Sequence, residues 1–278
     1  MKPLTFKLLR QPAFKVDLGV LTPDGLAGKT LAEIRRLPLA APGQTLCVGD
    51  LFEVSGSDRE SLQFRRSTDR VRNIGRDMTH GSIEVHGHAG HYLGRHMRGG
   101  RITVTGDAGD WVASGMVSGR IDISGNVGNY LGAAYPDERF GMTNGLVTVW
   151  GNAGDRIGDR MRRGQILVCG DAGDYIGGRM IAGTILVLGK CGRNIGYRMK
   201  RGTIVLRGSN PHLSPGFSSC GLLKMEFLRL LFKQTANMGR RFAFFRNFGP
   251  EVRRYAGDLT CDGKGEIFVL QNARLRER

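Results

Sequence analysis

The chain has 278 residues, and its 41 Lys and Arg residues against 25 Asp and Glu give a net charge of +16. This length can bury a substantial core, and the charge favours an anionic partner such as nucleic acid, a membrane surface, an acidic subunit or an acidic small molecule. The five cysteines are scattered without a CxxC pair, and no apolar run is long enough to cross a bilayer. These features argue against a disulfide framework and a membrane-spanning protein, and we expect a cytoplasmic protein with reduced thiols.

Residues 1–60 form a short N-terminal segment of mixed α and β character. Residues 4–9 have the pattern of a short strand. Thr30 and Glu33 have the spacing of a capping box, which predicts a helix over residues 31–36 that ends before Pro38. Residues 49–56 predict another strand closed by a turn, and residues 62–75 predict an irregular first unit of the repeat that follows.

From Met78 to Gly208 the chain repeats one 19-residue block of the form M-x-x-G-x-I-x-V-x-G-x-A-G-x-x-I-G-x-x. The blocks begin at Met78, Met97, Met116, Met142, Met161, Met180 and Met199. The interval of 26 residues from Met116 to Met142 holds one block plus a seven-residue insertion, YPDERFG, at residues 135–141. A fixed period near 20 residues indicates a solenoid, in which each unit buries its apolar face against its neighbours.

The apolar residues at positions six and eight of each block, such as Ile83 and Val85, alternate as in a strand with one buried face. The block is too short and too rich in glycine for an ordinary helix, and its glycines suit corners that require a positive φ. The sequence therefore predicts an all-β fold, with a right-handed parallel β-helix of Gly-rich coils of about 19 residues over residues 61–208. Block positions one, six, eight, twelve and sixteen should form buried ladders inside it.

Residues 209–278 predict a C-terminal cap. The apolar stretch LLKMEFLRLLFK predicts a helix over residues 222–233, docked on the far end of the β-helix. Residues 255–269 predict a strand, a turn and a second strand.

Basic side chains recur beside the methionine that opens each block, where we expect them to point outward. Adjacent coils lie about 4.8 Å apart, so these side chains should form a positive stripe along one corner. The candidate residues are Arg160, Arg162, Arg163, Arg179, Arg198, Lys200 and Arg201. The aspartates of the same blocks are expected at another corner, so stacked like charges would repel unless an anion met them. The stripe therefore predicts a site for a polyanion or an acidic partner.

Five of the six histidines lie close together, between residues 80 and 96. They are His80, His86, His88, His91 and His96. No cysteine or carboxylate set completes a tetrahedral metal site with them, so we interpret them as part of a partner interface rather than a metal centre.

Aspartates and aromatic residues also recur at fixed block positions. Asp107 and Asp110 share positions eleven and fourteen with asparagines, a histidine and a lysine in other blocks, which favours turn residues over calcium ligands. Tyr92, Trp111 and Tyr130 share position fifteen with Tyr175, which favours packing between strands or a partner contact over a base-stacking platform.

The glycine pattern G-x-x-G-x-x-x-G, as at Gly87, Gly90 and Gly94, resembles the C-terminal β-helix of glutamate synthase large subunits. It resembles more closely the C subunit of formylmethanofuran dehydrogenase and that of its bacterial relative, the formyltransferase/hydrolase complex. The flanking segments GDLFEVSG at residues 49–56 and YAGDL with GKGEIFV at residues 255–269 also resemble that protein. The resemblance covers most of the chain, and it is closest to the bacterial version.

This resemblance implies a scaffold subunit without an active site or cofactor of its own. Its partners would be a metal-dependent amidohydrolase-like subunit, a formyltransferase that takes the formyl group from tetrahydromethanopterin, and a further subunit. The complex would convert a formyl carrier to formate during formaldehyde oxidation in methylotrophy. The carrier would be a methanofuran-type molecule, whose glutamyl tail is one candidate ligand of the basic stripe.

Two other functions remain open from the sequence. The chain could be a free-standing β-helix enzyme that acts on an acidic polysaccharide, or a β-helix domain of a glutamate-synthase-like assembly. Nucleic-acid binding is disfavoured, because no nucleic-acid motif is present and no aromatic residues alternate with the basic stripe.

Overall fold

The computed structural model describes residues 2–208 and 211–271, and these residues are mostly β. The N-terminal segment contains β1 (Pro3–Leu8), β2 (Val16–Asp17), α1 (Pro23–Leu26), α2 (Leu31–Arg36), β3 (Pro38–Ala41), β4 (Gln44–Cys47), α3 (Val48–Leu51) and β5 (Phe52–Ser55). The repeats contain β6 (Asp58–Ser67), β7 (Val71–Arg72), β8 (Ser82–Gly87), β9 (Arg101–Val104), β10 (Arg120–Ile123), β11 (Leu146–Val149), β12 (Gln165–Val168), β13 (Thr184–Val187) and β14 (Arg201–Arg207). The C-terminal part contains β15 (Ser218–Lys224), α4 (Phe227–Ala236), the 3₁₀ helix η1 (Arg240–Asn247), β16 (Glu251–Gly257) and β17 (Lys264–Leu270).

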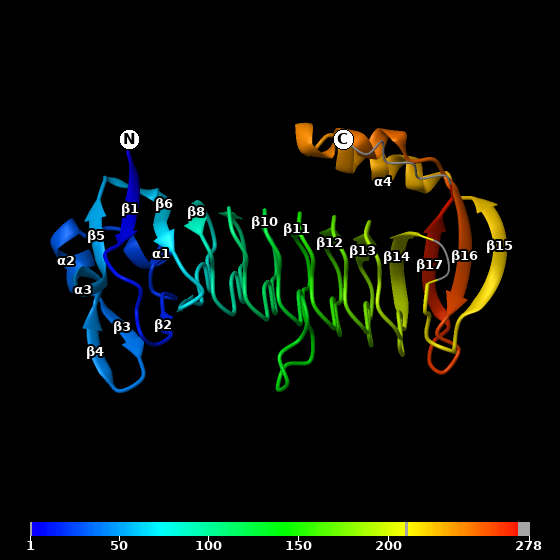
Figure 1. Cartoon of the computed structure of the whole chain (residues 1–278), viewed down its shortest axis with the longest axis horizontal. Coiled ribbons are helices and arrows are strands. Elements are labelled where there is room, and N and C mark those ends of the chain that lie inside the picture. The colour runs from blue at the N-terminus through cyan, green and yellow to red at the C-terminus, as the bar shows by residue number, and fades with distance from the viewer. Residues whose placement is uncertain (1, 209–210, 272–278) are drawn as a thin grey trace.

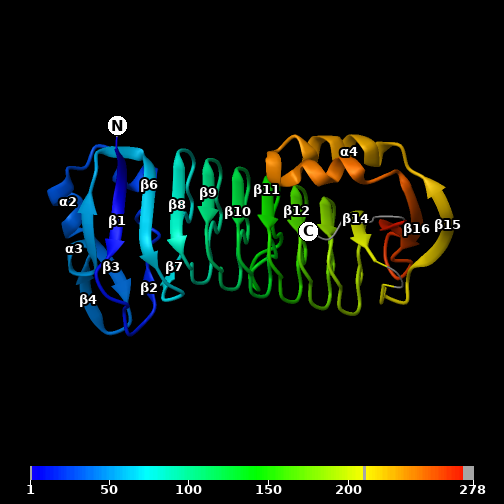
Figure 2. The same ribbon diagram turned by 45° about the horizontal axis from the view of Figure 1, so that its top comes forward.

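One sheet runs the length of the molecule as a row of strands (Figures 1 and 2). It has 13 strands in the order β15-β16-β17-β14-β13-β12-β11-β10-β9-β8-β6-β1-β5, and a second sheet has four in the order β4-β3-β2-β7. Both orders end in edge strands, so neither sheet of the described residues closes into a barrel. No helix in the described part of the chain is both long and apolar enough to span a membrane.

Successive blocks are joined at equivalent positions. Strands β8 to β14 pair in parallel with an offset of one block, so that Ile102 pairs with Ile83 on one side and with Ile121 on the other. Parallel bridges also join the residues at position twelve, as between Ala89 and Ala108. Each block is therefore held to the next by hydrogen bonds on more than one side.

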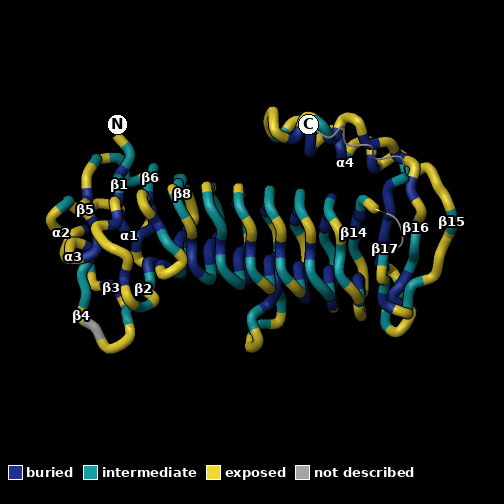
Figure 3. The backbone as a smooth tube through the Cα atoms, in the orientation of Figure 1, coloured by how far each residue is buried: buried dark blue, intermediate teal, exposed yellow. Residues whose placement is uncertain are grey.

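The predicted ladders are buried (Figure 3). The methionine that opens each block is fully buried, as are the isoleucines and valines at position six, such as Ile166. Position sixteen is also buried, and position twelve is buried except at Cys191, which is half-buried. Glycine at position four is required by close approach, because a Cβ on Gly119 would lie only 2.8 Å from the carbonyl oxygen of Gly100.

The N-terminal segment continues the large sheet, because β1 pairs in parallel with β6 and antiparallel with β5. The strand predicted over residues 4–9 is confirmed as β1, and the helix predicted over residues 31–36 is confirmed as α2. Thr30 and Glu33 form the predicted capping box at its start. The first residues of the stretch 49–56 belong to α3, and only its second half is the strand β5.

The predicted C-terminal helix is wrong in its bounds and in its location. Residues 222–224 belong to β15, and the helix α4 begins at Phe227 and ends at Ala236. It lies along the outward face of the sheet, beside β12 to β14, rather than across the end of the stack (Figures 1 and 2). The end is continued instead by the strand pair predicted over residues 255–269, which is confirmed as β16 and β17.

The outward block position seven explains where the helix lies. It is polar in the early blocks, with Glu84, Thr103 and Asp122, and becomes apolar in the later ones. The apolar residues Leu167, Leu186, Val205 and Phe268 form one buried cluster with Leu228, Phe232, Phe242, Phe245 and Phe248 of the helical segment. A continuous apolar stripe on an exposed sheet face must be covered, and α4 with η1 covers it.

We predict that Ile166→Asp lowers the free energy of unfolding by at least about 3 kcal/mol, because the carboxylate would enter a dry interior without a partner. The matched control is Gln165→Asp, which places the same charge on the neighbouring half-buried residue of β12. Chemical denaturation of both variants measures the difference. Equal stability of the two variants would contradict the burial of the ladder.

Candidate functional site

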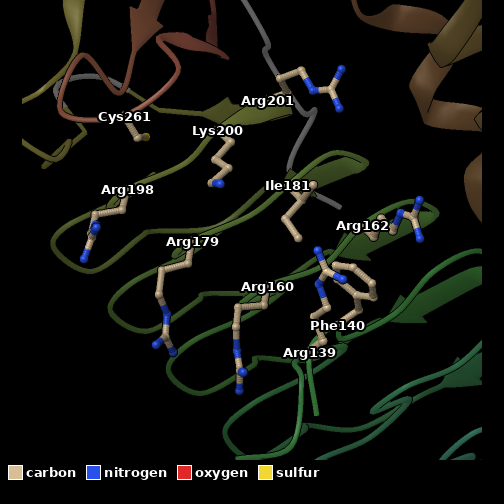
Figure 4. A pocket seen from close by; sticks show the side chains of 10 residues that line it. All are labelled: Arg139, Phe140, Arg160, Arg162, Arg179, Ile181, Arg198, Lys200, Arg201 and Cys261. Atoms are coloured by element: carbon tan, nitrogen blue, oxygen red, sulfur yellow. The ribbon is translucent and has the colours of Figure 1, made fainter.

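A groove lined by cationic side chains lies along one corner of the blocks (Figure 4). Its volume is about 540 Å³, and we call it the basic groove. It is lined by Arg139, Phe140, Arg160, Arg162, Arg179, Ile181, Arg198, Lys200, Arg201 and Cys261. Of the residues that the structure describes, no carboxylate belongs to this lining.

The basic groove contains six of the seven residues predicted for the basic stripe. The exception is Arg163, which lines a separate hollow with glycines such as Gly145 and Gly183. The sequence prediction missed the other four lining residues, which are Arg139, Phe140, Ile181 and Cys261. Arg139 and Phe140 belong to the insertion at residues 135–141, Ile181 follows the methionine that opens its block, and Cys261 lies in the turn between β16 and β17.

A left-handed corner places the arginines at position nineteen of each block. Arg160, Arg179 and Arg198 have φ values of 56°, 53° and 52°. Their amide groups donate hydrogen bonds to the next turn of the chain, from Arg160 to Gly178 (3.1 Å) and from Arg179 to Tyr197 (2.6 Å). The amide of Arg198 donates instead to the buried carboxylate of Asp258, at 2.9 Å. The same corner therefore recurs in these three blocks and brings the three side chains into one row (Figure 4).

Arg179 has an acidic partner, which corrects the expectation that the aspartates lie at another corner. Its Nε donates to Oδ1 of Asp159 at 2.9 Å, and its Nη2 donates to Oδ2. Asp159 is only 3% exposed, so this carboxylate depends on the arginine. These hydrogen bonds raise the pKa of the Arg179 guanidinium above its ordinary value.

Arg160 is held by the insertion. Its guanidinium donates to the carbonyl oxygens of Ala134 (3.2 Å), Tyr135 (3.0 Å) and Glu138 (2.6 Å). Arg160 therefore fixes the loop, and its charge is only partly available to a ligand in the basic groove.

The other cations of the basic groove are less committed. The guanidinium carbons of Arg139 and Arg162 each lie 4.9 Å from the centroid of the Phe140 ring. Arg198, Lys200 and Arg201 have no carboxylate within ion-pair distance among the described residues. An anion in the basic groove would therefore meet up to five cations that no acidic side chain in the described part of the chain neutralises.

The histidines do not converge on a common point. His88 and His91 accept hydrogen bonds through Nδ1 from the amides of Asp107 (3.1 Å) and Asp110 (3.0 Å). His80 lies between Asp24 and Glu60, and no cluster of potential metal ligands occurs among the described residues.

The recurring aspartates perform the same task as these two histidines. Oδ1 of Asp107 accepts the amide of Asn126 at 2.7 Å, and Oδ1 of Asp110 accepts the amide of Asn129 at 2.8 Å. Each of these side chains accepts a hydrogen bond from the backbone amide at the same position of the next block. The interpretation as turn residues accounts for Asp, Asn and His at positions eleven and fourteen.

The aromatic residues at position fifteen also lie on a left-handed corner, with φ of 62° at Trp111 and 64° at Tyr130. These two rings stack at 4.1 Å with an angle of 3° between their planes. Tyr135 of the insertion meets the edge of Trp111 at 5.1 Å and Tyr92 at 6.0 Å. The predicted packing of these side chains against one another is confirmed for Trp111 and Tyr130, but it occurs between the corners of neighbouring blocks and not between strands.

Comparison with known proteins identifies the family. Residues 68–219, more than half of the chain, match the family model described as "GXGXG motif". The structure aligns with a chain in the crystal structure of the formyltransferase/hydrolase complex (FhcABCD) from Methylorubrum extorquens in complex with methylofuran. The TM-score is 0.89 with 38% sequence identity, over 96% of this chain and 100% of that one. The chain belongs to the C-subunit family of formylmethanofuran dehydrogenases and formyltransferase/hydrolase complexes. The resemblance predicted from the sequence is confirmed.

Curated members of the C-subunit family align over a shorter stretch. The C subunit of the formyltransferase/hydrolase complex Fhc from Methylorubrum extorquens is 40% identical over 79 residues, which is 28% of this chain and 30% of that protein. The C subunit of the molybdenum-containing formylmethanofuran dehydrogenase 1 from Methanosarcina barkeri is 36% identical over 81 residues, 27% of either chain. These alignments thus span less than a third of the relatives' length.

We predict that Arg179→Ala lowers the free energy of unfolding by about 1–3 kcal/mol, because Asp159 would be left buried without a partner. Arg198→Ala removes the same charge from the same groove and is the matched control, expected to stay within about 0.5 kcal/mol of the parent. Urea denaturation distinguishes them. If both variants are equally stable, the Arg179–Asp159 pair has no structural role.

Proposed function

We propose that this chain is a non-catalytic scaffold subunit of a formyltransferase/hydrolase complex. The complex would act in one-carbon metabolism linked to tetrahydromethanopterin and methanofuran, and would release formate from a formyl carrier during formaldehyde oxidation. The observation that carries this proposal is the structural match over the full length of a chain from the FhcABCD complex, at 38% identity.

We also propose that the stacked blocks form a right-handed parallel β-helix. The constant offset of one block between parallel strands and the second row of bridges at position twelve support this architecture. The interior is filled by apolar ladders. A stiff rod with a dry core is suited to holding other subunits at fixed distances.

The chemistry would then reside in partners. By analogy with the family, these are an amidohydrolase-like subunit with a metal, a formyltransferase and a further subunit, all cytoplasmic. The basic groove is the surface of this chain that fits an anion. Its uncommitted cations, Arg198, Lys200 and Arg201, would either guide the glutamyl tail of a methanofuran-type carrier or clamp an acidic face of a neighbouring subunit.

The first experiment purifies a tagged form of this chain from its native host. We expect the other subunits to co-purify, and formyl transfer or hydrolysis to occur in the complex but not in the rigorously purified chain alone. Mass spectrometry and a formate assay measure the two outcomes. Turnover by the isolated chain, or its recovery without partners, would contradict the proposal.

The role of the basic groove is tested in the same complex with Arg198→Glu combined with Lys200→Glu. Exposed charges are screened beyond about 8–10 Å at physiological ionic strength, so guidance of a polyanion should be sensitive to salt. Slower turnover at low salt in an intact complex supports guidance of the tail, and dissociation of the complex supports a subunit interface. The control is Arg163→Glu, which lies outside the basic groove. Normal turnover at every salt concentration would refute both roles.

A further inference from the structure

The insertion at residues 135–141 interrupts the repeat and projects from the stack between β10 and β11 (Figure 1). It is nevertheless anchored to blocks on both sides. Oε1 of Glu138 accepts hydrogen bonds from Arg95 (2.8 Å) and His96 (2.7 Å), which belong to an earlier block. Arg160, from the following block, donates to two carbonyl oxygens of the insertion, those of Tyr135 and Glu138, and to that of the preceding residue Ala134.

The contacts with Arg95 and His96 change the pKa of the Glu138 carboxyl group. Burial alone would raise the pKa of Glu138, but the hydrogen bonds and positive charges of Arg95 and His96 outweigh it and hold this pKa below its ordinary value. The aromatic contacts of Tyr135 add a second anchor, since the Arg95 guanidinium also lies 4.5 Å above the Tyr135 ring. The loop therefore has one defined position against the blocks.

This position brings Arg139 and Phe140 to the wall of the basic groove (Figure 4). Phe140 contacts one arginine from the loop itself and one from a block, because Arg139 and Arg162 both lie 4.9 Å from its ring centroid. A guanidinium that stacks on an aromatic ring is held in one orientation, so its N–H groups point in a fixed direction. A planar fork of this kind binds a carboxylate through two parallel hydrogen bonds.

We propose that the insertion is a specificity element of the basic groove. Phe140 acts as a positioning residue that holds Arg139 and Arg162 as a clamp for one carboxylate at the loop end of a linear polycarboxylate. This inference rests on the proposed binding of a polyanion in the basic groove. It adds the residues that would distinguish a carboxylate chain from other anions.

The test measures the affinity of a fluorescein-labelled decaglutamate for the purified full-length chain by fluorescence anisotropy. Phe140→Leu keeps an apolar side chain but removes the ring, and we expect about tenfold weaker binding because two cation–π contacts are lost. Phe140→Trp keeps a ring and should bind within about twofold of the parent. Arg36→Ala, which removes a charge far from the basic groove, is the control for net charge. A thermal melt of each variant confirms that the comparison concerns folded protein.

If Phe140 only positions the two arginines, the losses of probe affinity caused by substituting Phe140 and by substituting the arginines should not be additive. Once Arg162→Ala and Arg139→Ala are both present, Phe140→Leu should weaken binding by less than about twofold, since Phe140 acts through these two arginines. Additive losses, equal weakening by Phe140→Leu and Phe140→Trp, or tighter binding of tripolyphosphate than of the carboxylate probe would each overturn the inference. Co-purification of the partner subunits with Phe140→Leu is measured separately. If the Phe140→Leu variant assembles normally and binds the probe as tightly as the parent, this inference alone is refuted. If the parent chain itself does not co-purify with partner subunits, the proposed function is refuted.

Discussion

The structure depends on hydrogen bonding between equivalent positions of neighbouring blocks. Strands β8 to β14 pair with the equivalent residues one block away, and so do the residues that form the bridges at position twelve. The acceptors at positions eleven and fourteen likewise bind the amide at the same position of the next block. A block of another length would displace all of these contacts at once. The constraint explains why the period of 19 residues is kept and why the one insertion is placed at a corner, where it can leave the stack and return. It also explains why His88 can replace aspartate at position eleven, because only an acceptor is required.

The same constraint places like side chains in rows. In the interior this is favourable, because rows of Met, Ile and Val bury one another. At position nineteen it places arginines side by side, and their repulsion has to be compensated. Asp159 compensates Arg179 and the carbonyl oxygens of the insertion compensate Arg160, but Arg198 has no such partner among the described residues. Arg198 lines the basic groove together with Lys200 and Arg201, which also lack a carboxylate partner among the described residues, and this is why the groove is the candidate site.

Much of the fold could be predicted because it depends on local pattern. The buried ladders follow from the repeat itself, and the helix α2 follows from Thr30 and Glu33. The helix α4 was misplaced because residues 222–224 are as apolar as the helix that follows, and nothing in that stretch alone separates strand from helix. The informative signal was elsewhere, in the change at position seven from Asp122 to Leu167 and Leu186, which marks the face that the helix covers.

The site was predicted less completely, for physical reasons that the sequence does not display. The row of basic residues is visible in the repeat, but the partner of Arg179 lies in the preceding block, 20 residues away, at a corner whose geometry the pattern does not reveal. Arg139 and Phe140 have no counterpart in other blocks, so periodicity cannot place them. The contacts of Glu138 with Arg95 and His96, together with the hydrogen bonds from Arg160, hold the insertion beside the basic groove.

The central claim is that the basic groove serves the assembled complex rather than the isolated chain. A cryo-electron microscopy structure of the complex, purified from the native host at low salt, tests it most directly. We expect carboxylates of a bound carrier or of a neighbouring subunit within hydrogen-bond distance of Arg198 and Lys200. An intact complex in which the basic groove faces bulk solvent, with no anion near these two residues, would contradict the account.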